Sequence, residues 1–163
     1  MVEMKLIWWR QRDAADLEPD GLHDRGEFDM SPHQPLRELD RLSNINECLK
    51  QAMEIEGAVG VALVDYSSGM CLGQSGGGDL DLEVAAAGNT EVIRAKIRTM
   101  EKLGLNEVIE DVLITLGTQY HLIRLLQGAN NEGLFLYIAL SKSRANLAMA
   151  RRELAAVETK IVL

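Results

Sequence analysis

Residues 58–140 carry the pattern of two groups of antiparallel strands separated by one long helix. The run 58–65 (AVGVALVD) is rich in β-forming residues and too short for a helix of typical length. Residues 66–69 (YSSG) supply turn chemistry, and a short second strand follows over 70–74. Short, turn-like segments also join the later apolar runs, so these runs should pair as antiparallel neighbours. The later strands are predicted at 108–116, 120–126 and 134–140.

Three amphipathic helices are predicted around these strands. The first spans 42–55, where apolar residues recur at helical spacing. The second begins after an N-cap at Asp79 or Asp81 and is closed by Gly104, and the third begins near Ser143. The order α-β-β-α-β-β-β-α predicts an α+β sandwich rather than a doubly wound parallel sheet.

The third helix should pack one apolar face on the sheet and turn a charged face to water. The apolar face consists of Leu147, Ala150, Leu154, Val157 and Ile161. The charged residues expected to face water are Arg151, Arg152, Glu153 and Glu158.

The chain changes character near residue 42. All three prolines lie before that point, and the segment 13–29 has seven acidic residues against one basic residue. Such a segment buries too little apolar surface to offset its ordering entropy. We therefore predict a flexible acidic arm over 1–41 and one folded domain over 42–163. The patch 4–9 (MKLIWW) is the exception, because it is apolar enough to dock on the domain or on a partner.

Charge limits the partners that this chain can have. The 163 residues carry a formal net charge of −8 at pH 7, and such a surface repels nucleic acids and anionic membranes. No apolar run approaches the roughly 20 residues of a membrane span, so no membrane insertion is expected. Cys48 and Cys71 lack metal-site spacing, and we expect them to be reduced thiols of a cytoplasmic protein.

No catalytic, cofactor or metal site is predicted. The glycines 76–78 precede a helix, as phosphate-binding loops do, but acidic residues follow where a Gly-Lys-Ser/Thr would be needed. His121 lies in a predicted strand, where a histidine is more often hydrogen-bonded to a neighbour than a metal ligand. Glu110 and Asp111 should point to opposite faces of their strand, which prevents them from acting as an acid/base pair. We therefore expect the protein not to be an enzyme.

The long helix has two stripes of residues at spacings of three and four. The stripe expected to face the sheet consists of Leu82, Ala86, Asn89, Ile93, Ile97 and Met100. The second stripe consists of Ala85, Gly88, Val92, Ala95 and Thr99. A glycine inside a helix costs about 1 kcal/mol relative to alanine, and close approach of another backbone would offset that cost. The second stripe is either a contact with a second copy of the chain or part of a broadly buried helix.

Several connected blocks resemble the Roadblock/dynein light chain family, in its bacterial type. The blocks are GAVGVALVDYSSGMCLGQSG (57–76), TEVIRAKIRTMEKLGL (90–105), VIEDVLITLGTQYHLIRLL (108–126), GLFLYIAL (133–140) and SRANLAMARREL (143–154). The resemblance covers about residues 42–160. It implies a five-stranded antiparallel sheet of profilin-like shape with helices on its faces. It also implies that two copies pair through the long helix and the third strand, and that the pair is a scaffold or regulator of a small Ras-like GTPase.

The resemblance identifies candidate residues for these contacts. The candidates for the homodimer interface are Ala85, Gly88, Val92, Ala95, Thr99, Val112 and Ile114. The candidates for docking an acidic partner are the basic residues Arg94, Arg98 and Lys102, which could equally form a solvated face balanced by nearby glutamates. Two other functions stay open: a PAS-like sensor of a small molecule, and a purely structural dimer without GTPase contact.

Overall fold

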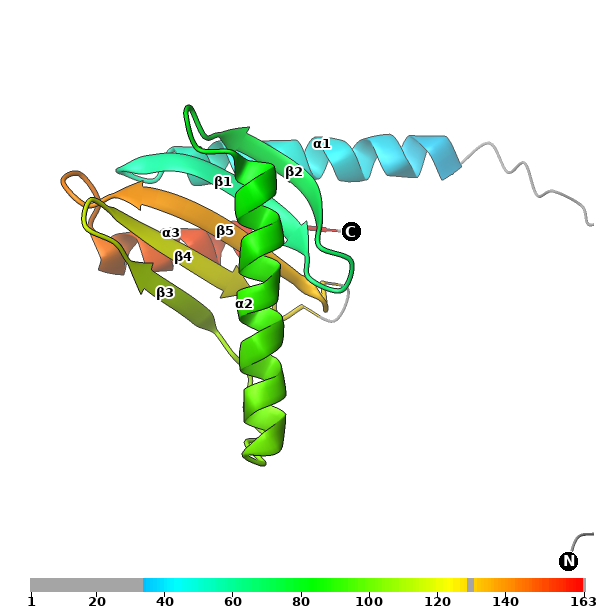
Figure 1. Cartoon of the computed structure of the whole chain (residues 1–163). Helices are drawn as coiled ribbons and strands as arrows, with labels where there is room; N and C mark the ends of the chain where they lie inside the picture. Colours follow the sequence, from blue (N-terminus) through cyan, green and yellow to red (C-terminus); the bar gives the residue numbers. More distant parts are fainter. Residues whose placement is uncertain (1–33, 129–130, 163) are drawn as a thin grey trace, which may run out of the picture. The chain divides into compact units, whose positions relative to one another are not determined.

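The computed structural model describes residues 34–128 and 131–162, which form three helices and one five-stranded antiparallel sheet (Figure 1). The strands are β1 (Ala58–Asp65), β2 (Met70–Gly76), β3 (Asp111–Thr115), β4 (Gln119–Leu125) and β5 (Leu134–Ser141). Their order across the sheet is β2-β1-β5-β4-β3, and every neighbouring pair is antiparallel. The predicted α+β architecture is therefore confirmed.

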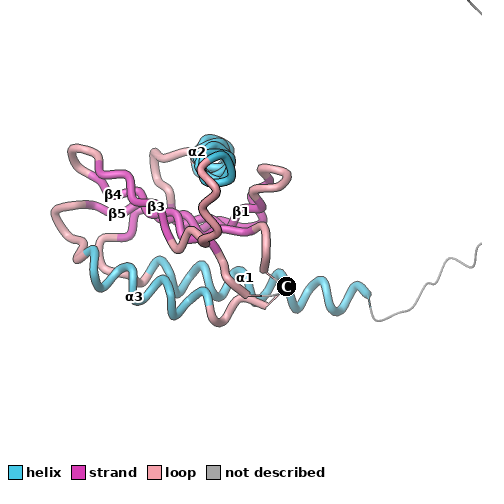
Figure 2. Tube along the Cα trace, turned by 90° about the horizontal axis from the view of Figure 1, so that it is seen from below, coloured by secondary structure: helices cyan, strands magenta, loops and turns pink. Residues whose placement is uncertain are grey.

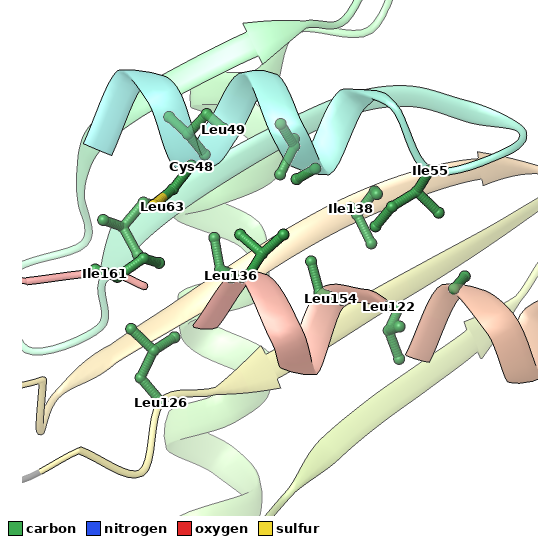
Figure 3. Close-up of a cluster of buried hydrophobic side chains, with 14 of the residues drawn as sticks. Cys48, Leu49, Ile55, Leu63, Leu122, Leu126, Leu136, Ile138, Leu154 and Ile161 are labelled. Atoms are coloured by element: carbon green, nitrogen blue, oxygen red, sulfur yellow. The ribbon is translucent and has the colours of Figure 1, made fainter. Parts of the chain in front are cut away.

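Helices cover both faces of the sheet, as the view along the sheet edge shows (Figure 2). One face carries α1 (Gln34–Met53) and α3 (Leu147–Glu158), and the other carries α2 (Leu82–Lys102). The core on the first face is the larger of the two, with Leu49 of α1 and Leu154 of α3 packed against Leu136 of β5 (Figure 3). The sheet is thus the middle layer of three.

The central strand β5 explains why two cores are possible. All its residues from Leu134 to Leu140 are buried, because it has a strand on each side and helices above and below. Side chains alternate between the faces, so Leu136 and Ile138 join the α1/α3 core while Phe135 and Tyr137 join the α2 core. A run that is apolar throughout is what a doubly covered strand requires.

Helix α2 has well-defined ends. The carboxylate of Asp81 accepts hydrogen bonds from the backbone N–H groups of Glu83 and Val84, both at 3.0 Å, so Asp81 is the N-cap of the two predicted candidates. At the other end Gly104 has φ +66°, the left-handed conformation that ends many helices. In between, the predicted sheet-facing stripe is buried at its first four positions, and Ile97 and Met100 are half-buried.

Element boundaries differ from the sequence prediction in three places. Helix α1 begins at Gln34 rather than near Leu42, β3 spans fewer residues than the predicted 108–116, and α3 begins after an N-cap at Asn146 rather than near Ser143. The first turns of α1 lack a core partner: Leu39 is 60% exposed and Leu42 is 43% exposed. Apolar periodicity could therefore not reveal them. The rest of the predicted acidic arm, 1–33, lies outside the described residues.

Glu158 is a correction to the predicted water-facing side of α3. Its side chain is buried, and its carboxylate is 2.5 Å from Nε of Arg124 on β4. Its second oxygen accepts a hydrogen bond of 2.9 Å from the backbone N–H of Gln127. A glutamate on an apolar face is stable when an arginine and a backbone donor satisfy it, and amino-acid type alone does not reveal such partners.

Candidate protein-interaction surface

The second stripe of α2 faces away from the sheet. Gly88, Val92, Ala95 and Thr99 are exposed, and Ala85 is half-buried. Val92 remains 38% exposed, and no residue of the described chain lies within 4 Å of a Cβ built on Gly88. The packing of the single chain therefore uses the first stripe and leaves the second one free. These residues form a shallow, largely apolar surface along the outer side of the helix.

A groove separates this surface from the adjacent part of the sheet. Its volume is about 340 Å³, and it lies between Val84, Gly88 and Val92 of α2 and the side chains of His121 and Tyr137. Val112 and Ile114 of β3 are half-buried on the same face of the sheet. In the ladder, Ile114 is paired with His121. The structure thus brings the predicted interface residues of the helix and of β3 to one side of the domain.

His121 forms a hydrogen-bonded chain on the floor of this groove. The Tyr137 hydroxyl lies 3.0 Å from Nδ1 of His121, and Nε2 lies 3.0 Å from Oε1 of Gln119. A glutamine Oε1 only accepts, so Nε2 carries the hydrogen and Nδ1 accepts from the tyrosine. Burial raises the pKa of Tyr137 to about 12, which keeps its hydroxyl protonated as that donor. The predicted role of His121 as a hydrogen-bonded strand residue is confirmed.

Acidification is expected to destabilise the wild-type chain more than a His121→Gln variant. Burial lowers the pKa of His121 below its ordinary value of 6.5, so the unfolded state takes up a proton that the folded state resists. Stability is therefore lost as the pH falls through 6.5 toward the lower folded pKa. The measurement is the urea unfolding midpoint of both proteins at about pH 7.5 and about pH 5.5. An equal drop in the two proteins would contradict the assignment.

Strand β3 forms one edge of the sheet. It pairs with β4 alone, so one row of its backbone N–H and C=O groups has no strand partner within the described chain. Arg151 of α3 holds the start of this strand through a 2.8 Å ion pair with Asp111. An anchored edge with free backbone groups is a template for pairing with another strand.

The three basic candidates on α2 have different environments. The Arg94 guanidinium donates to the backbone carbonyls of Tyr66 and Ser67, at 2.8 and 2.6 Å, and is also paired with Glu91. This residue therefore clamps the turn between β1 and β2. Arg98 and Lys102 are exposed toward solvent. Of the three, these two are better placed to meet a partner.

The β1–β2 turn that Arg94 holds is also fixed from within. Burial opposes ionisation of Asp65, but hydrogen bonds from Ser67 and Ser68 outweigh it and lower the pKa of this carboxyl. The turn is thus a rigid structural corner rather than a proton-transfer site.

Other reactive groups of the described residues also have structural settings. Burial raises the pKa of the Cys48 and Cys71 thiols, so neither is an activated nucleophile. Within 34–128 and 131–162, no three His, Cys, Asp or Glu side chains gather in a group that could hold a metal ion. None of the described helices combines the length and apolar content needed to cross a membrane.

A three-layer α+β domain with an edge-strand β3 and an unpacked stripe on α2 is the class of protein that these features define. Within that class, the described residues form a Roadblock-like domain. The sequence matches no family model and no curated protein, so this statement comes from structural likeness.

Three solved structures illustrate the likeness. MglB of Myxococcus xanthus superposes with a TM-score of 0.66 at 15% identity, over 75% of this chain and 87% of that one. The gliding protein MglB of Thermus thermophilus gives 0.62 at 14% identity, over 74% and 87%. A Roadblock/LC7 domain from Streptomyces avermitilis gives 0.60 at 13% identity, over 71% and 92%. At these identities the likeness establishes the fold.

Proposed function

We propose that this chain is a non-catalytic interaction module that works as a homodimer and holds or regulates a small Ras-like GTPase. The Roadblock-like fold supports an interaction role, and the family resemblance of the sequence supplies the GTPase as the partner class. The dimer forms through the second stripe of α2 and the free edge of β3. The GTPase binds by contact with the assembled surface, and this chain contributes no reacting group.

Gly88 is the observation that carries the dimer. A glycine in the middle of a helix costs about 1 kcal/mol relative to alanine, so a position that keeps one should need the missing side chain. Within the single chain nothing needs it, because a Cβ at Gly88 would meet open space. A second helix crossing at short distance would need it. The small residues Ala85 and Ala95 on the same stripe allow the same close approach.

Strand β3 supports the same arrangement. Its free backbone edge can pair with the β3 strand of a second copy about a two-fold axis, which makes one continuous sheet. The half-buried side chains of Val112 and Ile114 would then be covered by the partner. Burial of these side chains and of the α2 stripe provides the apolar contribution to association.

The proposed GTPase contact uses the exposed basic end of α2. Arg98 and Lys102 give this acidic chain a local positive surface, whereas Arg94 is occupied by the β1–β2 turn. Contact with one nucleotide state of the GTPase stabilises that state relative to the other. Any effect on hydrolysis would arise from repositioning of the GTPase's own switch residues.

A pull-down tests the proposed partner. The tagged chain is incubated with native lysate containing either GDP or a non-hydrolysable GTP analogue, and a small GTPase should be recovered mainly in one of the two. Joint Arg98→Glu and Lys102→Glu substitution should weaken recovery about tenfold, because two attractive charges at the contact become repulsive. Arg152→Glu, an exposed site on α3, is the matched control and should leave recovery unchanged.

Other results of the same experiment support the alternatives. Recovery of no GTPase with either nucleotide, from a chain that is dimeric, would favour the purely structural dimer. A thermal shift produced by a small molecule would instead favour the PAS-like sensor.

A further inference from the structure

A second groove lies at the far end of α2, away from the outward stripe. Its volume is about 360 Å³, within the range of pockets that hold ligand-sized groups. Its walls are the last turns of α2 and the segment 105–109, and its floor is the end of β4 at Leu125 and Leu126. We call it the α2-end groove.

The walls of the α2-end groove are apolar and open to solvent. Leu105 is 47% exposed and Val108 is 72% exposed, and Met100 lies beside them. Adjacent exposed apolar side chains that line a concavity mark a binding site more often than scattered ones do. The groove therefore favours an occupant with large apolar side chains.

The charges of the α2-end groove are all of one sign. Glu101, Glu107 and Glu132 line it, and none of its lining residues is a lysine, arginine or histidine. A rim of three carboxylates around an apolar floor attracts a segment that combines bulky apolar groups with cations. It repels an acidic segment.

One stretch of this sequence has that combination. Residues 4–12 (MKLIWWRQR) contain two tryptophans beside leucine and isoleucine, with three basic residues and no acidic one. The three positive charges match the three carboxylates of the groove in number. Tryptophan and arginine are also the residue types that most often dominate the binding energy of a small interface.

The connecting chain is long enough for this contact. Residues 13–33 separate the stretch from the start of α1, and 21 extended residues can span about 70 Å. Seven of the residues between 13 and 29 are acidic, so this connecting part is not attracted to the groove. Charge thus confines binding to the first twelve residues.

We propose that the α2-end groove is the docking site for residues 4–12 of this chain. The tryptophan side chains insert between Val108 and Met100, and the basic side chains pair with the rim glutamates. This inference is independent of the dimer and of the GTPase, because it uses neither the outward stripe nor Arg98 and Lys102.

The two tryptophans make the proposal testable in the full-length chain, because Trp8 and Trp9 are the only tryptophans present. Their fluorescence therefore reports on this stretch alone. We expect emission at shorter wavelength than that of a synthetic peptide of residues 1–14, together with reduced quenching by acrylamide. Val108→Asp combined with Glu107→Lys should shift the emission to that of the free peptide.

Controls keep the outcome decisive. Both substituted side chains are exposed, so the fold should survive, and circular dichroism checks this. Val162→Asp and Glu153→Lys make the same changes at exposed sites outside the groove and should leave the emission unshifted. Emission identical to the free peptide in the unmodified chain would overturn the proposal. Shifted emission that the groove variants leave unchanged would also overturn it, because the tryptophans would then be buried elsewhere.

Discussion

Replacing Gly88 with leucine is expected to convert the dimer into a monomer without unfolding the domain. A leucine side chain at the centre of the α2 stripe would occupy the space that the partner helix needs. Overpacking of this kind costs about 1–3 kcal/mol, which corresponds to roughly a 10- to 100-fold weaker association. The folded chain itself should tolerate the change, because the site faces open space and leucine is a good helix former. Light scattering should report a mass near 18.0 kDa instead of twice that value.

Two matched variants separate dimer contact from helix stability. Ala87→Leu adds the same side chain at a neighbouring exposed position of α2 that lies off the stripe, and it should leave the dimer mass unchanged. Gly88→Ala adds helix propensity of about 1 kcal/mol with one methyl group and should stabilise the monomer fold. A Gly88→Leu protein that keeps the dimer mass would show that the stripe is not the interface.

Replacing Glu158 with alanine is expected to lower the free energy of unfolding by about 2–3 kcal/mol. The Glu158 and Arg124 side chains are only 11% and 18% exposed, so water replaces the lost carboxylate poorly. The change leaves the Arg124 guanidinium and the Gln127 backbone N–H without their acceptor. Because this cluster ties α3 to β4, the loss should appear as a lower denaturant midpoint at a fixed protein concentration.

A double variant distinguishes this cause from lost packing. Arg124→Met with Glu158→Leu removes both charges and keeps most of the side-chain volume, so it should be more stable than Glu158→Ala alone. If the double variant were as unstable as the single one, the unpaired arginine would not be the source of the loss.

The sequence predicts the buried elements of this domain well, because their patterns reflect packing. The run 58–65 is β1 with the same bounds, and Asp81 and Gly104 mark both ends of α2. The elements that were misplaced lack such a signal. The first turns of α1 have exposed leucines, and β3 is a short edge strand whose flanking residues only look strand-like.

The candidate surface could be predicted in part for the same reason. The outward stripe of α2 is visible as a second periodicity, and the structure places it on an exposed face. Contacts between residues distant in sequence were not predictable. The partner of Arg94 is a pair of backbone carbonyls on the β1–β2 turn, and His121 meets Tyr137 across neighbouring strands. Such pairs depend on strand register, which composition and spacing do not define.

Sedimentation equilibrium of the unmodified chain over a range of concentrations tests the central claim most directly. The proposed self-association through α2 and β3 predicts a single species of twice 18.0 kDa at micromolar concentrations, dissociating on dilution with one monomer–dimer constant. A mass of 18.0 kDa at every concentration would contradict it, because the outward stripe and the free β3 edge would then have no second copy to cover them.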